Sequence, residues 1–94
     1  MTSRAYFYRQ RDLQVNPMED GYVVYQPVRD RVHFLNRTAA LVLELCDGRN
    51  DAHDIEVLVA EAYGIVEPKQ SLTGDILERF TQEGIVYLET VTGE

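Results

Sequence analysis

Alternating apolar and polar positions in the first third of the chain predict three short β-strands. Residues 13–15 alternate leucine, glutamine and valine, which is the period of two expected of a half-buried strand. Asp20-Gly21 is a turn dipeptide typical of hairpins, and residues 22–25 after it are all β-branched or aromatic. After a short connection, residues 31–35 are predicted to form the third strand. We therefore expect a three-stranded antiparallel meander with residues 31–35 at an edge. The aromatic residues 6–8 either extend the first strand or lie across the sheet.

From residue 36 onward the apolar period changes to that of a helix. Asn36 is a good N-cap, and the residues that follow repeat at the spacing of one helix face, namely Ala39, Val42, Leu43 and Cys46. Leu41 and Leu45 make this helix apolar almost all round, so we expect it to be the buried one. Asp47-Gly48 ends it.

Two further helices are predicted by caps and apolar stripes. Asn50 or Asp51 caps the second helix, whose inward stripe is Ile55, Leu58, Val59 and Ala62, and Gly64 closes it. Pro68 suits the first turn of the third helix, which carries Leu72, Ile76, Leu77 and Phe80 on one side and ends at Gly84. Residues 85–88 form a short, strand-like apolar tail. The expected fold is α+β and winged-helix-like, a three-stranded antiparallel meander followed by three short helices in a single domain over residues 1–94.

Charge and composition narrow the possible partners. Six arginines oppose four acids through residue 37, whereas three basic residues oppose twelve acids in the remainder. An acidic body repels phosphate backbones, so nucleic acid is not an expected partner. The chain has no secretory signal or membrane-length apolar run, and its one cysteine fits a reducing compartment. We therefore expect a cytoplasmic protein that is a monomer or a weak dimer.

The residues that carry chemistry form no catalytic or metal-binding pattern. His33 lies in a strand and His53 in a first helical turn, and both are expected to be surface or half-buried side chains. Cys46 belongs to the apolar stripe of the first helix, where a thiol is packed and inert. The sequence contains no glycine-rich nucleotide loop and no nucleophile elbow. We expect no catalytic residue, no metal and no cofactor.

The expected strands have an unusual distribution of apolar side chains. Both faces of residues 22–25 and 31–35 carry apolar side chains, although a sheet covered by helices on one face is expected to be polar on the other. Either these residues are simply good strand formers, or the second face accepts an apolar ligand. An exposed edge at residues 31–35 would add main-chain donors and acceptors for β-strand addition.

The order of these motifs resembles the PqqD-like family, the recognition elements of ribosomally made, post-translationally modified peptides. The strongest match is Leu35-Asn36 followed by Thr38-Ala39, with Asp47-Gly48 further along. The resemblance covers about residues 13–86. Asp75-Ile76 resembles an acidic–apolar pair of the family's third helix, but it lies closer to Gly84 than the family pattern usually has it.

The resemblance implies a non-catalytic module that binds the leader segment of a precursor peptide and presents it to a modifying enzyme. The leader would add as an antiparallel strand to residues 31–35, with side chains in the groove beside the third helix. The implied contacts are Arg31, Val32, His33, Phe34 and Leu35 on the strand, and Leu72, Asp75, Ile76, Arg79 and Phe80 on the helix. Two alternatives stay open, a winged-helix nucleic-acid binder and a structural subunit that binds a folded enzyme partner.

Overall fold

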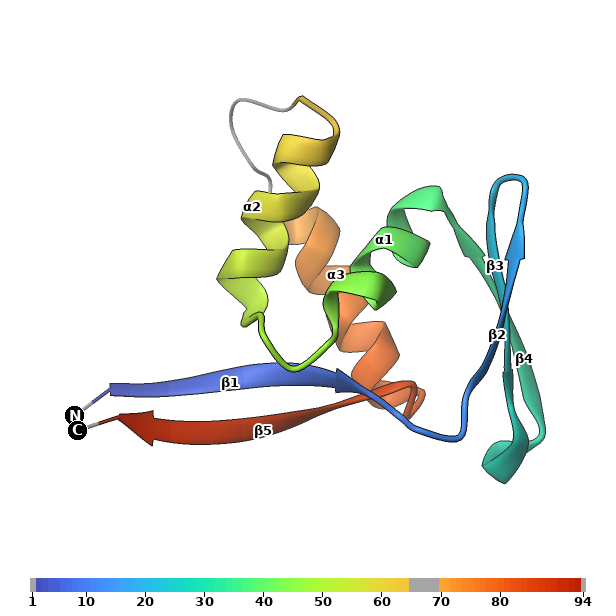
Figure 1. The fold of residues 1–94 in the computed structure, drawn as a ribbon, viewed down its shortest axis with the longest axis horizontal. Coiled ribbons are helices and arrows are strands. Elements are labelled where there is room, and N and C mark those ends of the chain that lie inside the picture. Colours follow the sequence, from blue (N-terminus) through green and yellow to red (C-terminus); the bar gives the residue numbers. More distant parts are fainter. Residues whose placement is uncertain (1, 65–69, 94) are drawn as a thin grey trace.

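The computed structural model describes residues 2–64 and 70–93 and confirms the α+β class. In chain order the elements are β1 (Thr2–Arg9), β2 (Gln14–Met18), β3 (Gly21–Gln26), a 3₁₀ turn (Pro27–Arg29), β4 (Arg31–Asn36), α1 (Arg37–Leu45), α2 (Ala52–Ala62), α3 (Gln70–Gln82) and β5 (Val86–Gly93). The meander β2-β3-β4 stands at one end of the molecule, α1 lies between it and the other two helices, and a β1–β5 ribbon runs beneath the helices (Figure 1).

The predicted meander is confirmed, with both of its pairs antiparallel. Gly21 begins β3 with φ 147°, and a Cβ added there would meet the carbonyl oxygen of Leu35 at 1.8 Å. Only glycine allows β4 to lie this close at that position. The inner face of the sheet packs against α1 through Val24 and Leu35.

Helix α1 begins where its cap was predicted and supplies the centre of the core. The side chain of Asn36 accepts a hydrogen bond of 2.9 Å from the N–H of Ala39. Val42, Leu43 and Cys46 have no exposed surface, while Leu41 and Leu45 are partly buried. The helix therefore joins the sheet on one side to α2 and α3 on the other.

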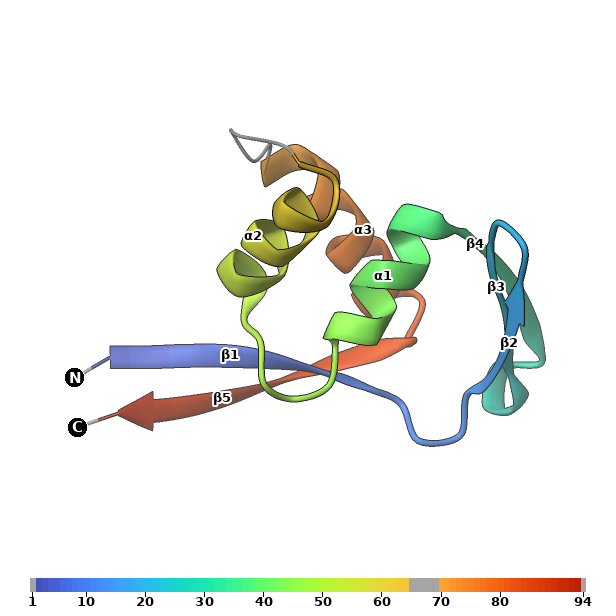
Figure 2. The ribbon, with the colours of Figure 1, turned by 45° about the horizontal axis from the view of Figure 1, so that its top comes forward.

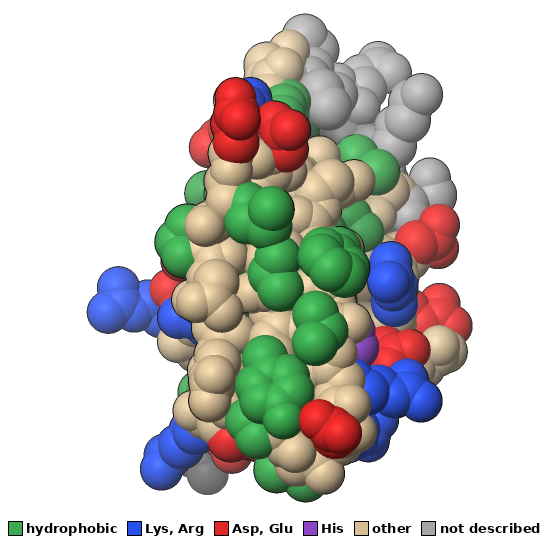
Figure 3. Space-filling view, turned by 90° about the vertical axis from the view of Figure 1, so that its right-hand side faces the viewer, with side chains coloured by type: hydrophobic (Ala, Val, Ile, Leu, Met, Phe, Trp, Pro, Cys, Tyr) green, Lys and Arg blue, Asp and Glu red, His purple; other side chains and the backbone are tan. Residues whose placement is uncertain are grey.

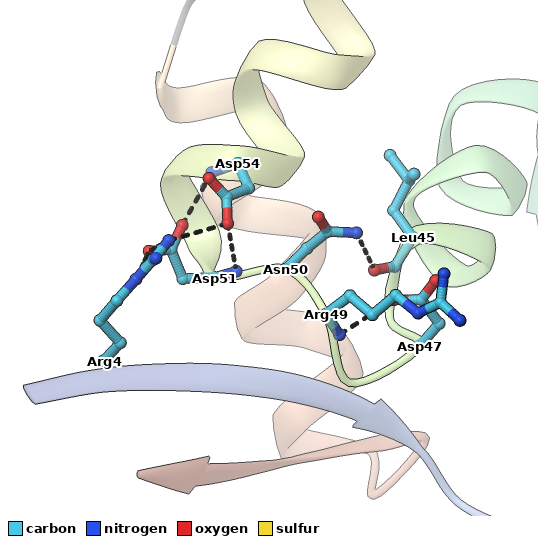
Figure 4. A network of polar contacts seen from close by, with 7 residues as sticks. All are labelled: Arg4, Leu45, Asp47, Arg49, Asn50, Asp51 and Asp54. Atoms are coloured by element: carbon cyan, nitrogen blue, oxygen red, sulfur yellow. Dashed lines mark hydrogen bonds and ion pairs between the residues drawn. The ribbon is translucent and has the colours of Figure 1, made fainter. Parts of the chain in front are cut away.

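Helix α2 is capped by Asp51 in a reciprocal arrangement with Asp54, whose side chain accepts from the N–H of Asp51. Arg4 reaches both carboxylates from β1, and the side chain of Asn50 donates to the carbonyl of Leu45 (Figure 4). These contacts fasten the loop between α1 and α2 and tie it to the ribbon.

The predicted inward stripe of α2 is partly wrong. Ile55 and Val59 are buried as expected, but Leu58 and Ala62 are exposed, and Ala60 is buried in their place. The buried face is rotated because α2 packs against both α1 and α3 and also contacts β1.

Helix α3 buries the C-terminal half of its apolar side. Leu77 and Phe80 are in the core and Ile76 packs against it, whereas Leu72 is 45% exposed. Gly84 ends the helix with φ 71°, as expected of a left-handed C-terminal residue. The expected role of Pro68 lies outside the described residues. No described helix is long and apolar enough to span a membrane.

The aromatic segment 6–8 neither extends the meander nor lies across it. It belongs to β1, which pairs antiparallel with β5 from Thr2↔Gly93 to Arg9↔Val86. The expected strand-like tail is thus half of a second, two-stranded sheet, seen beneath the helices in two views (Figures 1 and 2). Phe7 points from the ribbon into the core, and Tyr8 stacks on Tyr87 with ring centroids 5.3 Å apart.

Candidate functional site

The edges of the β2-β3-β4 sheet differ in the main-chain groups that they present. Pro17 in β2 has no N–H, so it fits where that group would point away from β3. Its partner across the pair, Tyr22, then directs its N–H and C=O toward β4, where it opposes Leu35. The position of the Leu35 carbonyl against Gly21 agrees with this direction.

The same alternation fixes which groups reach the open edge of β4. Leu35 and His33 direct their N–H and C=O groups toward β3. Because this direction alternates from residue to residue along a strand, Val32 and Phe34 direct their N–H and C=O groups outward. β4 is the outer strand of its sheet in the described part of the chain. The edge of β2 is interrupted by Pro17, whereas β4 contains no proline. The β4 edge is therefore the one that can pair with another strand.

The side chains of β4 divide cleanly between the two faces of the sheet. Val32 and Phe34 lie on the outer face and are 52% and 73% exposed, while His33 and Leu35 face the helices and are buried. Figure 3 looks at the outer side and shows a band of hydrophobic side chains flanked by charged ones. The outer face of the meander is thus apolar, as the pattern of residues 22–25 and 31–35 indicated.

A buried polar chain connects β4, β3 and the end of α3. Nε2 of His33 lies 3.0 Å from Oε1 of Gln26. The amide nitrogen of Gln26 donates to the carbonyls of Glu83 and Gly84, at 2.9 and 3.2 Å. His33 was expected to be surface or half-buried, and it is instead buried, because its strand position points to the helices. Burial lowers the pKa of His33 below its ordinary value.

Two arginines converge on Glu83 beside this polar chain. Nη1 of Arg31 donates to Oε2 of Glu83 at 2.8 Å, and Nη1 of Arg29 donates to the Glu83 carbonyl at 2.9 Å. The charges of both arginines, and that of Arg79, also lower the pKa of His33. The start of β4 is therefore basic and is held against the C-terminal turn of α3.

Helix α3 presents a mixed face beside this end of β4. Arg79 and Glu83 are four residues apart, so they share one side of the helix, and both act on residues of β4. Ile76 and Leu72 continue the same side toward the helix start. At about 1.5 Å per residue, Leu72 lies roughly 16 Å along the axis from Glu83.

The residues implied by the resemblance are distributed over three environments. Arg31, Val32 and Phe34 on β4, and Leu72, Asp75 and Arg79 on α3, are exposed. Ile76 is half-buried between them and the core. His33, Leu35 and Phe80 are buried.

Sequence reasoning missed Gln26 and Glu83, which join β3 to the end of α3. Gln26 alternates with Val24 along β3, so a polar residue at an inward position was the signal that could have revealed it. Cys46 is fully buried, and burial raises the pKa of its thiol to about 12. Residues 2–64 and 70–93 contain no cluster of three metal-ligating side chains.

Comparison with known proteins relates this chain to one protein family. The family model described as coenzyme PQQ synthesis protein D matches residues 21–86, well over half of the chain. The chain belongs to the PqqD family. PqqD proteins are non-catalytic partners of modifying enzymes and bind the precursor peptides of those enzymes. Searches of curated proteins and of solved structures gave no significant match. The PqqD match runs from the first residue of β3 to the first residue of β5, so it contains β4 and α3 but not β1.

Proposed function

We propose that this PqqD chain binds the leader segment of a precursor peptide as an antiparallel strand along β4 and presents it to a modifying enzyme. The supporting observation is the asymmetry of the sheet edges. Pro17 interrupts the edge of β2, while Val32 and Phe34 leave main-chain donors and acceptors open on β4. β-strand addition uses such groups for affinity and side-chain pockets for specificity.

The surroundings of β4 define what the leader would meet. On the inner side of β4 the leader would meet the half-buried Ile76 of α3, and at the start of β4 it would meet Arg31 and Arg79. A strand antiparallel to β4 brings its C-terminal part to Arg31, so an acidic residue is favoured there. Arg31 already pairs with Glu83, so the gain from a further exposed ion pair is small, about 0.2–1 kcal/mol.

Binding to nucleic acid has less support from the same surfaces. Arg29 and Arg31 are the arginines near the β3–β4 connection that could contact a phosphate backbone, and both donate to Glu83. The outer sheet face is apolar instead of basic (Figure 3). A structural subunit for a folded enzyme would use that face without any peptide on β4, so the experiment must report on the edge itself.

The test compares Val32→Pro with Val32→Ala, using the leader peptide of a precursor encoded beside this chain. Both variants lose the exposed valine side chain, but only the proline variant loses the outward N–H. We expect calorimetry to give near-wild-type affinity for Val32→Ala and at least a tenfold loss for Val32→Pro. Equal affinity of a folded Val32→Pro variant would rule out strand addition at β4.

A further inference from the structure

A hollow lies at the end of the β2-β3-β4 sheet, beside the β2–β3 turn. It has a volume of about 500 Å³ and is lined by residues 18–22 and by Phe34, Leu35 and Asn36. Pockets that hold ligand groups have volumes of roughly 300–1,000 Å³. The hollow is therefore large enough to take a bulky side chain.

Part of the lining of the hollow is one row of residues across the sheet. Met18, Gly21 and Asn36 stand opposite one another across β2, β3 and β4. The central residue of this row has no side chain, and the backbone of Leu35 and Asn36 occupies the place where its Cβ would lie. Met18 and Phe34 are the large apolar side chains of the outer face that line the hollow.

The exposure of apolar side chains on this face increases toward the open edge. Val23 and Tyr25 in the central strand are partly covered by their neighbours, whereas Val32 and Phe34 in β4 are 52% and 73% exposed. In the described sheet, Phe34 has the strand β3 on one side, and its other side is the open edge of β4. A strand paired with β4 would place side chains about 4.5–5.5 Å from Phe34 on the same face.

We infer that the outer face of β4 is a second specificity surface, in which Phe34 and the hollow beside Met18 take a large apolar side chain of the bound peptide. This inference rests on the proposed strand addition. Successive residues of an added strand point to opposite faces, so the side chains of the peptide alternate between the side of the sheet that faces α3 and this outer surface. Because the added strand is antiparallel, the outer anchor belongs to its N-terminal part.

The charge of the lining favours one kind of flanking residue. Glu19 and Asp20 line the hollow, and Asp20 is 3.6 Å from Arg37 in a largely exposed pair. An acidic residue next to the outer anchor would be repelled by these carboxylates. The expected partner is an aromatic or long aliphatic side chain with neutral or basic neighbours.

The probe is a displayed library of random twelve-residue peptides, selected on the wild-type chain. Peptides that bind Val32→Pro equally well are discarded, because they do not need the β4 edge. The strongest remaining peptide is synthesised and titrated against wild type, Phe34→Ser, Met18→Ser and the control Val28→Ser. Val28 is 82% exposed and lies in the 3₁₀ turn, away from the hollow.

We expect Phe34→Ser to weaken binding at least tenfold and Met18→Ser at least threefold, with Val28→Ser unchanged. Met18 is two strands away from the open edge, so main-chain pairing alone would leave its substitution silent. Circular dichroism checks that each variant is folded. If Val32→Pro unfolds, the selected peptides are tested by hydrogen exchange instead. A peptide is then kept only if it protects the amides of Val32 and Phe34 in its complex with the wild-type chain.

The outcomes distinguish failure of the proposed function from failure of this inference. If no selected peptide depends on the β4 edge, both the proposed function and this inference are overturned. If edge-dependent peptides bind Phe34→Ser and Met18→Ser as tightly as wild type, strand addition stands and the outer anchor is wrong. The inference is also overturned if the wild type sediments as a dimer that both serine variants dissociate while peptide affinity is unchanged, since a second copy then covers this face.

Discussion

The imidazole of His33 donates its Nε2 hydrogen to Oε1 of Gln26, across 3.0 Å of the protein interior. The direction follows from the other end of the amide, because the nitrogen of Gln26 donates to the carbonyls of Glu83 and Gly84. Its oxygen must therefore face His33 as the acceptor. This pair fixes the end of α3 against β3 and β4.

Gln26→Ala should lower the free energy of unfolding by about 1–3 kcal/mol, because it leaves buried polar partners without hydrogen bonds. The measurement is the denaturant midpoint, with the exposed Gln14→Ala on β2 as control. A midpoint shift no larger than that of the control would mean that water satisfies those groups equally well.

Acidification should destabilise the fold through His33. Burial lowers its pKa, the charges of Arg79, Arg31 and Arg29 lower it further, and Glu83 opposes them. The unfolded chain takes up the proton near the ordinary pKa of 6.5, and the folded chain only at lower pH. The contribution is therefore fully present above about pH 6.5 and is lost as the pH falls through the folded pKa.

This dependence is measured as the change in unfolding free energy between pH 7.5 and 5. His33→Gln should flatten the slope, and His53→Gln, at an exposed position, should leave it as in wild type. An equal slope in wild type and His33→Gln would assign the effect to carboxylates instead.

Proline should have opposite effects at two adjacent positions of β4. The N–H of His33 is directed to β3, so His33→Pro removes a ladder hydrogen bond and should lower the midpoint strongly. The N–H of Val32 is directed outward, so Val32→Pro should cost the fold little. Thermal denaturation of both variants measures this difference, and the reverse order would mean that the strand directions derived from Pro17 are wrong.

Leu43→Ala should destabilise the protein by about 2–5 kcal/mol, because a fully buried leucine loses its contacts and leaves a cavity. Leu72→Ala is the matched control, since that leucine is 45% exposed. Chemical denaturation of the two variants gives the comparison. Similar losses at both positions would contradict the central place of α1 in the core.

The sequence was most informative where local patterns decide the structure. The turn at Asp20-Gly21, the cap at Asn36 and the end of α3 at Gly84 each depend on a few neighbouring residues, and all three were predicted. The buried face of α2 was predicted less well, because Leu58 and Ala60 are distinguished only by the helices packed around them. The β1–β5 pairing joins the two ends of the chain, and no local signal reports it.

Part of the candidate site was likewise predictable from the sequence, and part was not. The apolar outer face, with Val32 and Phe34, follows from strand alternation and was visible in the sequence. The link from Gln26 to Glu83 was not, because its two residues are 57 positions apart and meet only through the packing of α3. The direction of the N–H and C=O groups of β4 could be derived only after the structure had placed Pro17 opposite Tyr22.

The ribbon of β1 and β5 has a consequence for protein architecture. Thr2 pairs with Gly93, so the described chain enters and leaves the fold at neighbouring points, about 4.5–5.5 Å apart (Figure 1). Adjacent ends permit a fold to be inserted into a surface loop of another protein or circularly permuted. The ribbon thus brings both described ends together at one end of the molecule, and the meander with the β4 edge lies at the other (Figure 1).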